Sequence, residues 1–368
     1  MRPDTIVFLG AGASAQDGAP TQRQVITEFR DYYNKRFSQK NKIIEDYFLK
    51  YFGIDLLNEK NDRFPTFEEM LGIIDLAISR NESFSGSNNT NPFIELKEQR
   101  LELIYLIGKT LERSLRRHTI YHDKMIGTLE QQEALDQTVF ISTNYDILID
   151  NAVSRYLREN QNSNGENWKS RLNYGVNVRD LDSKGDIKLS RTRLITILKL
   201  HGSLSWLYCT TCNILHISYD RKGGLQAIKR PTLCTNGSCN TRMYPIIIPP
   251  SYFKAMSNFH LLQIWKQAEN YLKSSKRVIF CGYSLPEADI HIKYLLKRAE
   301  VNRKENDLKI YLFNKNPTRQ GYSTDNSTFE NYTRFFKRST RIIDTKEPFS
   351  TFCERGVRFL EELDNRVE

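Results

Sequence analysis

The fold of this chain is most constrained by short apolar segments that each end in a cluster of small or polar residues. Val139–Ser142 runs directly into Thr143–Asp146, and the segment at 195–200 runs into His201. The clusters that follow such segments are Gly10–Ser14, Thr143–Asp146, His201–Ser203, Gly282–Leu285 and Asn314–Thr318. Short apolar strands alternating with helices predict an α/β fold with a parallel, doubly wound sheet. Ligands of such sheets lie outside the carboxyl ends of the strands, so we expect the clusters to meet at one edge.

The remaining secondary structure is predicted from apolar spacing. The predicted strands cover residues 5–9, 139–142, 195–200, 277–281, 309–313 and 340–344. Helices are predicted over 67–78, 93–117, 147–157, 286–299 and 350–363, with further helix within 20–50 and a loop at 81–92. Thr66 and Glu69 have the spacing of a capping box. The apolar stripe of 93–117 favours a core position, although a long helix is also a common oligomer surface.

The cluster Gly10–Ser14 has the small residues that let a backbone approach a pyrophosphate at a helix N-terminus. An ordinary strand-to-helix turn explains it equally well. Ala15 stands where the dinucleotide fingerprint has its third glycine, and no Gly-Lys-Ser/Thr of a Walker A loop is present.

Asn144, Asp146 and His201 are the candidate catalytic side chains, and each also has a purely structural interpretation. Asp146 is placed to cap the helix that follows it. Asn144 is a residue type that bonds its own backbone in turns. His201 has the position of a turn histidine. The repetition of polar groups at one predicted sheet edge favours a functional site.

Four of the six cysteines form two closely spaced pairs. Cys209 and Cys212 make one pair, Cys234 and Cys239 the other, and 21 residues separate the pairs. Two such pairs predict a closed tetrahedral zinc site with a structural role. His216 lies between the pairs and is not expected to be a ligand, and a redox site would need a lone Cys-x-x-Cys. Cys281 and Cys353 are predicted to be buried thiols.

The net charge of +10 fits either a nucleic-acid surface or simply a basic, soluble surface, because acidic residues are interspersed throughout. No apolar run approaches the length that spans a bilayer, and residues 1–3 carry no secretion pattern. We therefore expect a cytoplasmic protein that does not enter the membrane.

Taken in order, the motifs resemble the sirtuin (silent information regulator 2-like) family. The residues that carry the resemblance span 10–318 and read Gly-Ala-Gly-Ala-Ser, Thr-Asn-Tyr-Asp, Leu-His-Gly-Ser, Cys-x2-Cys…Cys-x4-Cys, Gly-Tyr-Ser-Leu and Asn-Lys-Asn-Pro-Thr. The resemblance implies a Rossmann-like NAD-binding domain formed by 1–35, 131–205 and 244–368. It also implies a smaller module made of a helical insertion at 36–130 and a zinc ribbon at 206–243.

The resemblance also implies roles for individual residues, with NAD as the substrate and Zn²⁺ as a structural ion. Asn144 would orient the nicotinamide ribose and the attacking water, Asp146 would hold the nicotinamide end, and His201 would be the general base. The residues expected to bind the cofactor are Gly10, Ala11, Gly12, Ala13, Ser14, Thr143, Gly282, Ser284 and Asn314. Within this set, Ala11, Gly12 and Ser14 would line the pyrophosphate, Gly282 and Ser284 would contact phosphate or ribose, and Asn314 the adenosine ribose.

Departures from the protein-deacylating members point to a different branch of the family. Thr21-Gln22-Arg23 replaces an Asp-Phe-Arg-Ser-like segment, and residues 244–250 contain three prolines where deacylases pair with an acyl-lysine peptide. The chain thus looks like a bacterial antiphage-defence member that hydrolyses NAD, working as a homo-oligomer or beside a HerA-like hexameric ATPase or an Argonaute-type protein. An NAD-dependent protein deacylase and a non-catalytic sensor of NAD or ADP-ribose are the alternatives.

Overall fold

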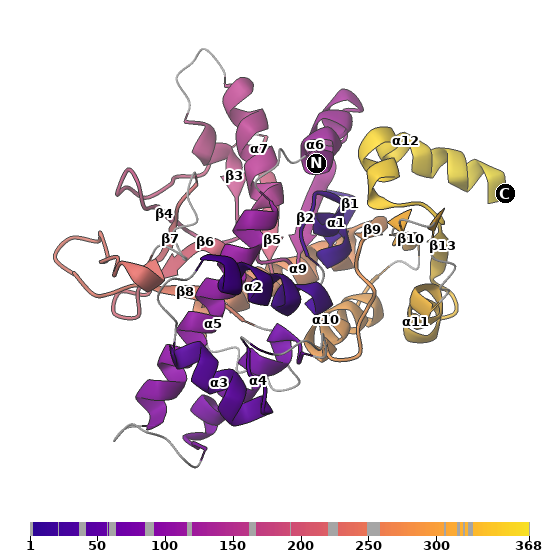
Figure 1. Cartoon of the computed structure of the whole chain (residues 1–368). Coiled ribbons are helices and arrows are strands. Elements are labelled where there is room, and N and C mark those ends of the chain that lie inside the picture. Colours follow the sequence, from indigo (N-terminus) through magenta and orange to yellow (C-terminus); the bar gives the residue numbers. More distant parts are fainter. Residues whose placement is uncertain are drawn as a thin grey trace.

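A seven-stranded parallel sheet forms the centre of the protein in the computed structural model (Figure 1). The structure describes residues 3–20, 22–36, 42–56, 58, 64–84, 92–115, 120–161, 167–191, 193–219, 227–248, 258–304, 307–314, 317–318, 321–322 and 327–367. The strand order is β13-β10-β9-β1-β2-β5-β3, and the pairs are parallel. The predicted fold class is therefore confirmed.

The strands of this sheet are short and consist mainly of buried apolar residues. Their bounds are β1 Thr5–Leu9, β2 Thr138–Ser142, β3 Leu172–Asn173, β5 Ile195–Lys199, β9 Arg277–Cys281, β10 Lys309–Phe313 and β13 Arg341–Asp344. The register aligns Leu9 with both Ser142 and Cys281, so neighbouring strands end in one row. After β1 the chain adds β2 on one side and later β9 on the other, which makes the end of β1 the topological switch point.

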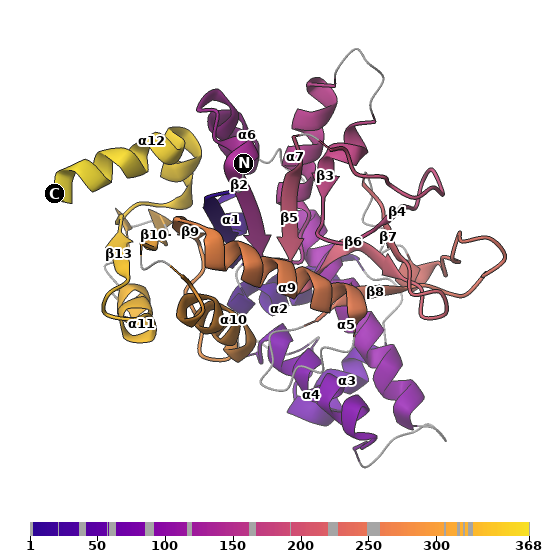
Figure 2. The same cartoon turned by 180° about the vertical axis from the view of Figure 1, so that it is seen from behind.

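Helices cover both faces of the sheet. On one face α6 (Tyr121–Gln131) packs against α7 (Leu148–Glu159) and α12 (Phe349–Val367), and α12 also contacts α1 (Ala11–Gln16). On the other face α9 (Phe259–Ser274) packs against α10 (Ile290–Val301), and Figure 2 shows α9 crossing the strands. The two-stranded hairpin β11 (Pro317–Thr318) and β12 (Gly321–Tyr322) precedes α11 (Ser327–Phe335).

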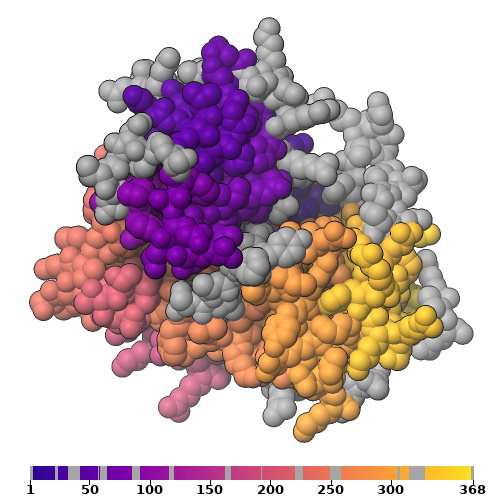
Figure 3. Space-filling view, turned by 90° about the horizontal axis from the view of Figure 1, so that it is seen from below, coloured from indigo at the N-terminus to yellow at the C-terminus, as the bar shows by residue number. Residues whose placement is uncertain are grey.

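A helical module lies beside the carboxyl edge of the sheet and has its own apolar core. It consists of α2 (Gln22–Arg36), α3 (Lys42–Phe52), α4 (Phe67–Arg80) and α5 (Pro92–Ser114). The stripe of α5 is buried against α2, α3 and α4, so the core interpretation of this helix is confirmed. The capping box is also confirmed, since Thr66 Oγ1 accepts the Glu69 N–H at 3.2 Å. Figure 3 shows the module, in purple, sharing one face of the molecule with the orange residues around α10.

A second, four-stranded sheet carries the cysteine segment. Its order is β4-β7-β6-β8, with bounds β4 Arg179–Asp180, β7 Leu215–Ile217, β6 Gly202–Tyr208 and β8 Tyr244–Ile247. Because only two residues separate the end of β5 from the start of β6, this sheet is attached directly to the edge where the predicted clusters lie.

Candidate active site

A cavity of about 350 Å³ opens at the carboxyl ends of β1, β2, β5, β9 and β10. Residues from all five predicted clusters line it. The helical module closes its other side through Phe67 and Glu68 of α4, Val25 of α2 and Leu111 of α5. The cavity therefore lies where the strand order reverses, which is the usual ligand site of a doubly wound sheet.

Most of the predicted site residues line this one cavity. They are Ala11, Gly12, Ser14, Thr143, Asn144, Asp146, His201, Gly282, Ser284 and Asn314. Gly10 and Ala13 are not among the lining residues. Ala13 is fully buried in the main core, and a Cβ on Gly10 would lie 2.5 Å from the Gly282 carbonyl oxygen. These two positions lie where the turn after β1 approaches Gly282 in the turn after β9, and they do not face the cavity.

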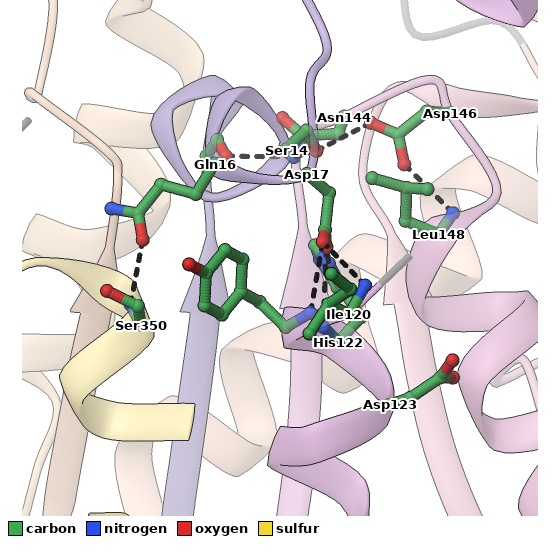
Figure 4. Close-up of polar contacts among 12 residues, drawn as sticks. Ser14, Gln16, Asp17, Ile120, His122, Asp123, Asn144, Asp146, Leu148 and Ser350 are labelled. Carbon is green, nitrogen blue, oxygen red and sulfur yellow. Dashed lines mark hydrogen bonds and ion pairs between the residues drawn. The ribbon is translucent and has the colours of Figure 1, made fainter. Parts of the chain in front are cut away.

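Three of the lining side chains form a hydrogen-bond chain (Figure 4). Asn144 Nδ2 donates to Ser14 Oγ at 2.9 Å, and Ser14 Oγ donates to Asp146 Oδ2 at 2.7 Å. Asn144 Nδ2 also donates to the Gly10 carbonyl at 2.9 Å. The loop after β2 is thereby fastened to the first turn after β1, so the amide and the carboxylate hold fixed positions.

The structural interpretations of these residues account for only part of what they do. Asp146 Oδ1 accepts the Leu148 N–H at 3.0 Å at the start of α7, as a capping carboxylate would. Its second oxygen is the one that meets Ser14. The Asn144 side chain does not bond its own turn but reaches across to Gly10 and Ser14 in the segment after β1. A role as a local turn residue therefore does not explain Asn144.

His201 lies in the tight connection between β5 and β6. The φ of Gly202 is 83°, and a Cβ there would lie 2.1 Å from the Ile246 carbonyl oxygen, so only glycine allows this approach of β8. The imidazole is 2% exposed, and its Nε2 lies 3.8 Å from Asp289 Oδ1. The rings of His201 and Tyr145 are 6.0 Å apart, which brings the imidazole next to the loop that carries Asn144.

Four titratable cavity residues were not among the predicted site residues: Glu68, Tyr145, Tyr283 and Asp289. Asp289 falls inside the helix predicted over 286–299, but α10 begins only at Ile290, so Asp289 precedes it. Burial, together with the carboxylates of Glu68 and Asp289, raises the pKa of Tyr145 well above its usual range. The sequence did carry one signal for Asp289: it lies only a few positions after the Gly-Tyr-Ser-Leu motif.

A buried lysine, Lys199, holds the loop after β2 from the side of the core. Sequence reasoning missed it because it is the last residue of β5. Lys199 is fully buried, and its Nζ donates to the Asp146 carbonyl oxygen and lies 3.1 Å from Asp150 Oδ2. Tyr174 completes the network by donating its hydroxyl to Asp150 Oδ1 at 2.9 Å. The main chain of the loop at Asp146 is thus held by a charge in the core.

The first turn is held from its other side by Asp17 (Figure 4). Its carboxylate accepts the backbone N–H groups of Ile120 and Tyr121 at 2.9 and 3.0 Å and contacts His122 Nδ1 at 2.5 Å. Burial alone would raise the pKa of Asp17, but the His122 side chain and the backbone N–H groups of Tyr121 and His122 lower it overall. Asp17 therefore connects α1 to α6 and has a structural role.

The four clustered cysteines meet at one point in the second sheet. Their sulfur atoms all lie within 4.8 Å of one another. The Sγ atoms of Cys209 and Cys239 are 3.6 Å apart, and those of Cys212 and Cys234 are 3.4 Å apart. Ligands at ~2.3 Å from a tetrahedral ion lie ~3.8 Å from each other, so the thiols fit a metal. His216 Nε2 lies 3.5 Å from Cys234 Sγ, outside the set of four.

The fold and the position of the cavity define the class of protein: a doubly wound α/β protein with a ligand site at its switch point. A family model described as "SIR2-like domain" matches residues 138–335. This match covers more than half of the chain, so the protein belongs to the SIR2-like domain family. No curated protein matches the chain.

Solved structures that resemble the chain include Sir2 proteins with ligands. "Structure of Sir2Tm bound to a propionylated peptide" is 13% identical, with a TM-score of 0.42, covering 97% of this chain and 93% of that chain. "Sir2-p53 peptide-NAD+" is 12% identical, with a TM-score of 0.41 and the same coverage.

Among the described residues, no helix combines the length and apolarity needed to cross a bilayer.

Proposed function

We propose that this chain hydrolyses NAD⁺ at the bond between nicotinamide and ribose, giving nicotinamide and ADP-ribose. The observation that carries the proposal is the shared cavity: Asn144, Asp146 and His201 line it together with the small residues after β1. A carboxamide, a carboxylate and an imidazole are the groups that would position water, hold the substrate and accept a proton. A chain of the SIR2-like family offers them at its switch point.

The reaction breaks a glycosidic C–N bond, and positive charge develops on the ribose as in glycoside cleavage. Asn144 would hold the water and the nicotinamide ribose, and Asp146 the nicotinamide end. His201 would take the proton from the attacking water. The described lining residues include the carboxylates Glu68, Asp146 and Asp289 but no Lys or Arg, an environment that favours a cationic centre.

The segment where a deacylase would pair with a peptide makes contacts within this chain. The Ile248 N–H donates to the His201 carbonyl at 3.0 Å, and its carbonyl accepts the Tyr145 hydroxyl at 3.0 Å. Both backbone groups are thus used next to the cavity. The prolines at 249 and 250 lie outside the described residues. This pairing favours water over an acyl-lysine as the nucleophile.

Incubation of the purified chain with NAD⁺ alone tests the proposal. Nicotinamide and ADP-ribose, separated by chromatography, are expected to accumulate without any peptide. Asn144→Ala is expected to lose turnover while its circular dichroism and melting temperature stay near those of the wild type. Product formation only in the presence of an acyl-lysine peptide would establish the deacylase instead. Binding of ADP-ribose with no turnover in either mixture would establish the sensor.

We propose that the four thiols hold one structural Zn²⁺. The apolar cluster around them is small, comprising Leu207, Cys209, Ala227, Cys234 and Met243, so the ion would supply much of the local stability.

Elemental analysis is expected to find about one zinc per chain. Removal by a strong chelator should lower the melting temperature, and zinc should restore it. Cys212→Ser is expected to lose the ion, whereas Cys353→Ser, at a buried thiol outside the cluster, should retain it. A chain that melts at the same temperature with and without chelator would contradict this.

We further propose that the protein is a cytoplasmic antiphage effector acting in an assembly. Unrestrained NAD⁺ loss would kill the host cell, so the activity would be held low until a homo-oligomer, a HerA-like hexameric ATPase or an Argonaute-type partner engages it. The family resemblance supports this, and the basic net charge is compatible with a nucleic-acid trigger. The same turnover assay over a range of chain concentrations tests self-assembly, because specific activity would then rise with concentration.

A further inference from the structure

Asp289 is a buried carboxylate at the side of the cavity where His201 lies. Its side chain is 4% exposed, and Oδ1 lies 3.8 Å from His201 Nε2. This separation is longer than a hydrogen bond, and contacts of catalytic groups commonly tighten when substrate binds. The two side chains come from different segments, one following β5 and the other preceding α10. Tertiary structure, not local sequence, brings them together.

The local role expected for an aspartate at this position is absent. Asp289 is the N-cap residue of α10, where its carboxylate would normally accept an N–H of the first turn and stabilise the helix by ~1 kcal/mol. It makes no such side-chain bond. Instead Oδ2 accepts the hydroxyl of Tyr283 at 2.9 Å. The carboxylate is therefore turned away from its own helix and toward the cavity.

The partner that orients Asp289 is itself held firmly. Tyr283 is buried against Phe8, with ring centroids 4.9 Å apart. Its backbone N–H donates to Asn314 Oδ1 at 3.0 Å, and its carbonyl accepts the Tyr332 hydroxyl at 2.7 Å. The same loop contains Leu285 at a φ of 55°, a left-handed conformation that costs energy for leucine. The surroundings thus hold a strained loop in one conformation, with Asp289 at its end.

We propose that Asp289 is a positioning residue for His201, and that Tyr283 fixes its carboxylate; this rests on the proposed NAD⁺ hydrolysis. A carboxylate next to Nε2 favours the tautomer protonated there and leaves Nδ1 to accept a proton. As the water oxygen bonds to the ribose carbon, the C–N bond breaks and its electron pair leaves with neutral nicotinamide. The water proton passes to Nδ1, and Asp289 stabilises the imidazolium until the proton is released to solvent.

Among the described residues, the other titratable groups at the cavity are Glu68 from α4, Tyr145 and Asp146 from the loop after β2, and Tyr283. Asp146 is engaged with Ser14 and Leu148, and Tyr145 is directed to Ile248. Asp289 is the carboxylate that contacts the imidazole at 3.8 Å. Removing its charge should therefore lower the pKa of His201, while Glu68 and Asp146 keep part of the negative field.

Asp289→Asn is the discriminating variant, because asparagine has nearly the same shape and caps helices equally well. We expect kcat for NAD⁺ hydrolysis to fall about 10–100-fold, part of the ~10²–10⁴-fold that a general base supplies, with KM nearly unchanged. The acid limb of the kcat/KM profile should move about one pH unit lower, because an opposite charge at this distance shifts a pKa by ~1–3 units. Asp289→Glu should recover part of the loss, and Tyr283→Phe should shift the limb in the same direction by less.

A measurement without turnover separates this inference from the proposed function. The pKa of His201 is followed by NMR of histidine-labelled protein, with its signal assigned through His201→Gln. A lower His201 pKa in Asp289→Asn supports the pairing even if the wild type does not hydrolyse NAD⁺. An unchanged His201 pKa overturns the pairing even if the wild type is active. A raised KM with an unmoved acid limb would make Asp289 a substrate-binding residue and would also overturn it.

Discussion

Replacing His201 with alanine is expected to lower the rate of NAD⁺ hydrolysis by at least the ~10²–10⁴-fold that a positioned general base contributes. The imidazole lies in the cavity beside Asp289 and next to the loop of Asn144, and the described lining residues include no second histidine to replace it. Initial rates of nicotinamide release, measured at saturating NAD⁺, give the loss in kcat. Near-wild-type turnover would remove His201 from the mechanism.

The substitution leaves Asp289 with Tyr283 as its hydrogen-bond donor, so folding has to be checked in the same preparation. His260→Ala is a matched control: that histidine is also buried, but it bonds the Asn213 carbonyl at 2.7 Å and does not line the cavity. It is expected to retain activity. Addition of imidazole to His201→Ala should restore part of the rate if the missing group is a base. Loss of activity in both variants, with lowered melting temperatures, would indicate destabilisation instead.

The features that could be predicted from the sequence are those that depend on contiguous or regularly spaced residues. The strands predicted at 277–281 and 309–313 coincide with β9 and β10, because β-branched and aromatic runs of this length are buried on both faces. The clustering of four thiols followed from their spacing. The cavity followed from topology, since parallel strands in register end in one row.

What could not be predicted depends on residues that meet only in the folded chain. Lys199 belongs to an apolar strand by position, and its ion pair with Asp150 is visible only once β5 lies beside α7. Asp289 has the local signal of a helix cap but a different partner. The strands β3 and β4 have two residues each, too few to show a period. In the structure α2 packs against α4 and α5 of the helical module, and α6 packs against α7 and α12. The domain boundaries at 35/36 and 130/131 stay a prediction.

The largest effect on stability is expected from Lys199→Met. The lysine is fully buried, and removal of one partner of a buried ion pair leaves an uncompensated charge that costs about 3–5 kcal/mol. Here the remaining charge would be Asp150, supported by the Tyr174 hydroxyl alone at 2.9 Å among the contacts described above. The free energy of unfolding, measured by urea denaturation followed by circular dichroism, should fall by this amount.

Two further variants separate the buried charge from the loss of a long side chain. Lys124→Met makes the same replacement in the exposed pair with Glu354, where the side chains are 47% and 52% exposed, and should cost ~1 kcal/mol or less. Lys199→Met combined with Asp150→Asn removes both charges and should be more stable than Lys199→Met alone, because no unpaired charge stays in the core. Equal stability of the single and double variants would show that the pair does not hold this part of the core. Lys199 also bonds the Asp146 carbonyl, so Lys199→Met and the double variant should lose NAD⁺ turnover even where they are folded. The stability of the core is thereby connected to the geometry of the cavity.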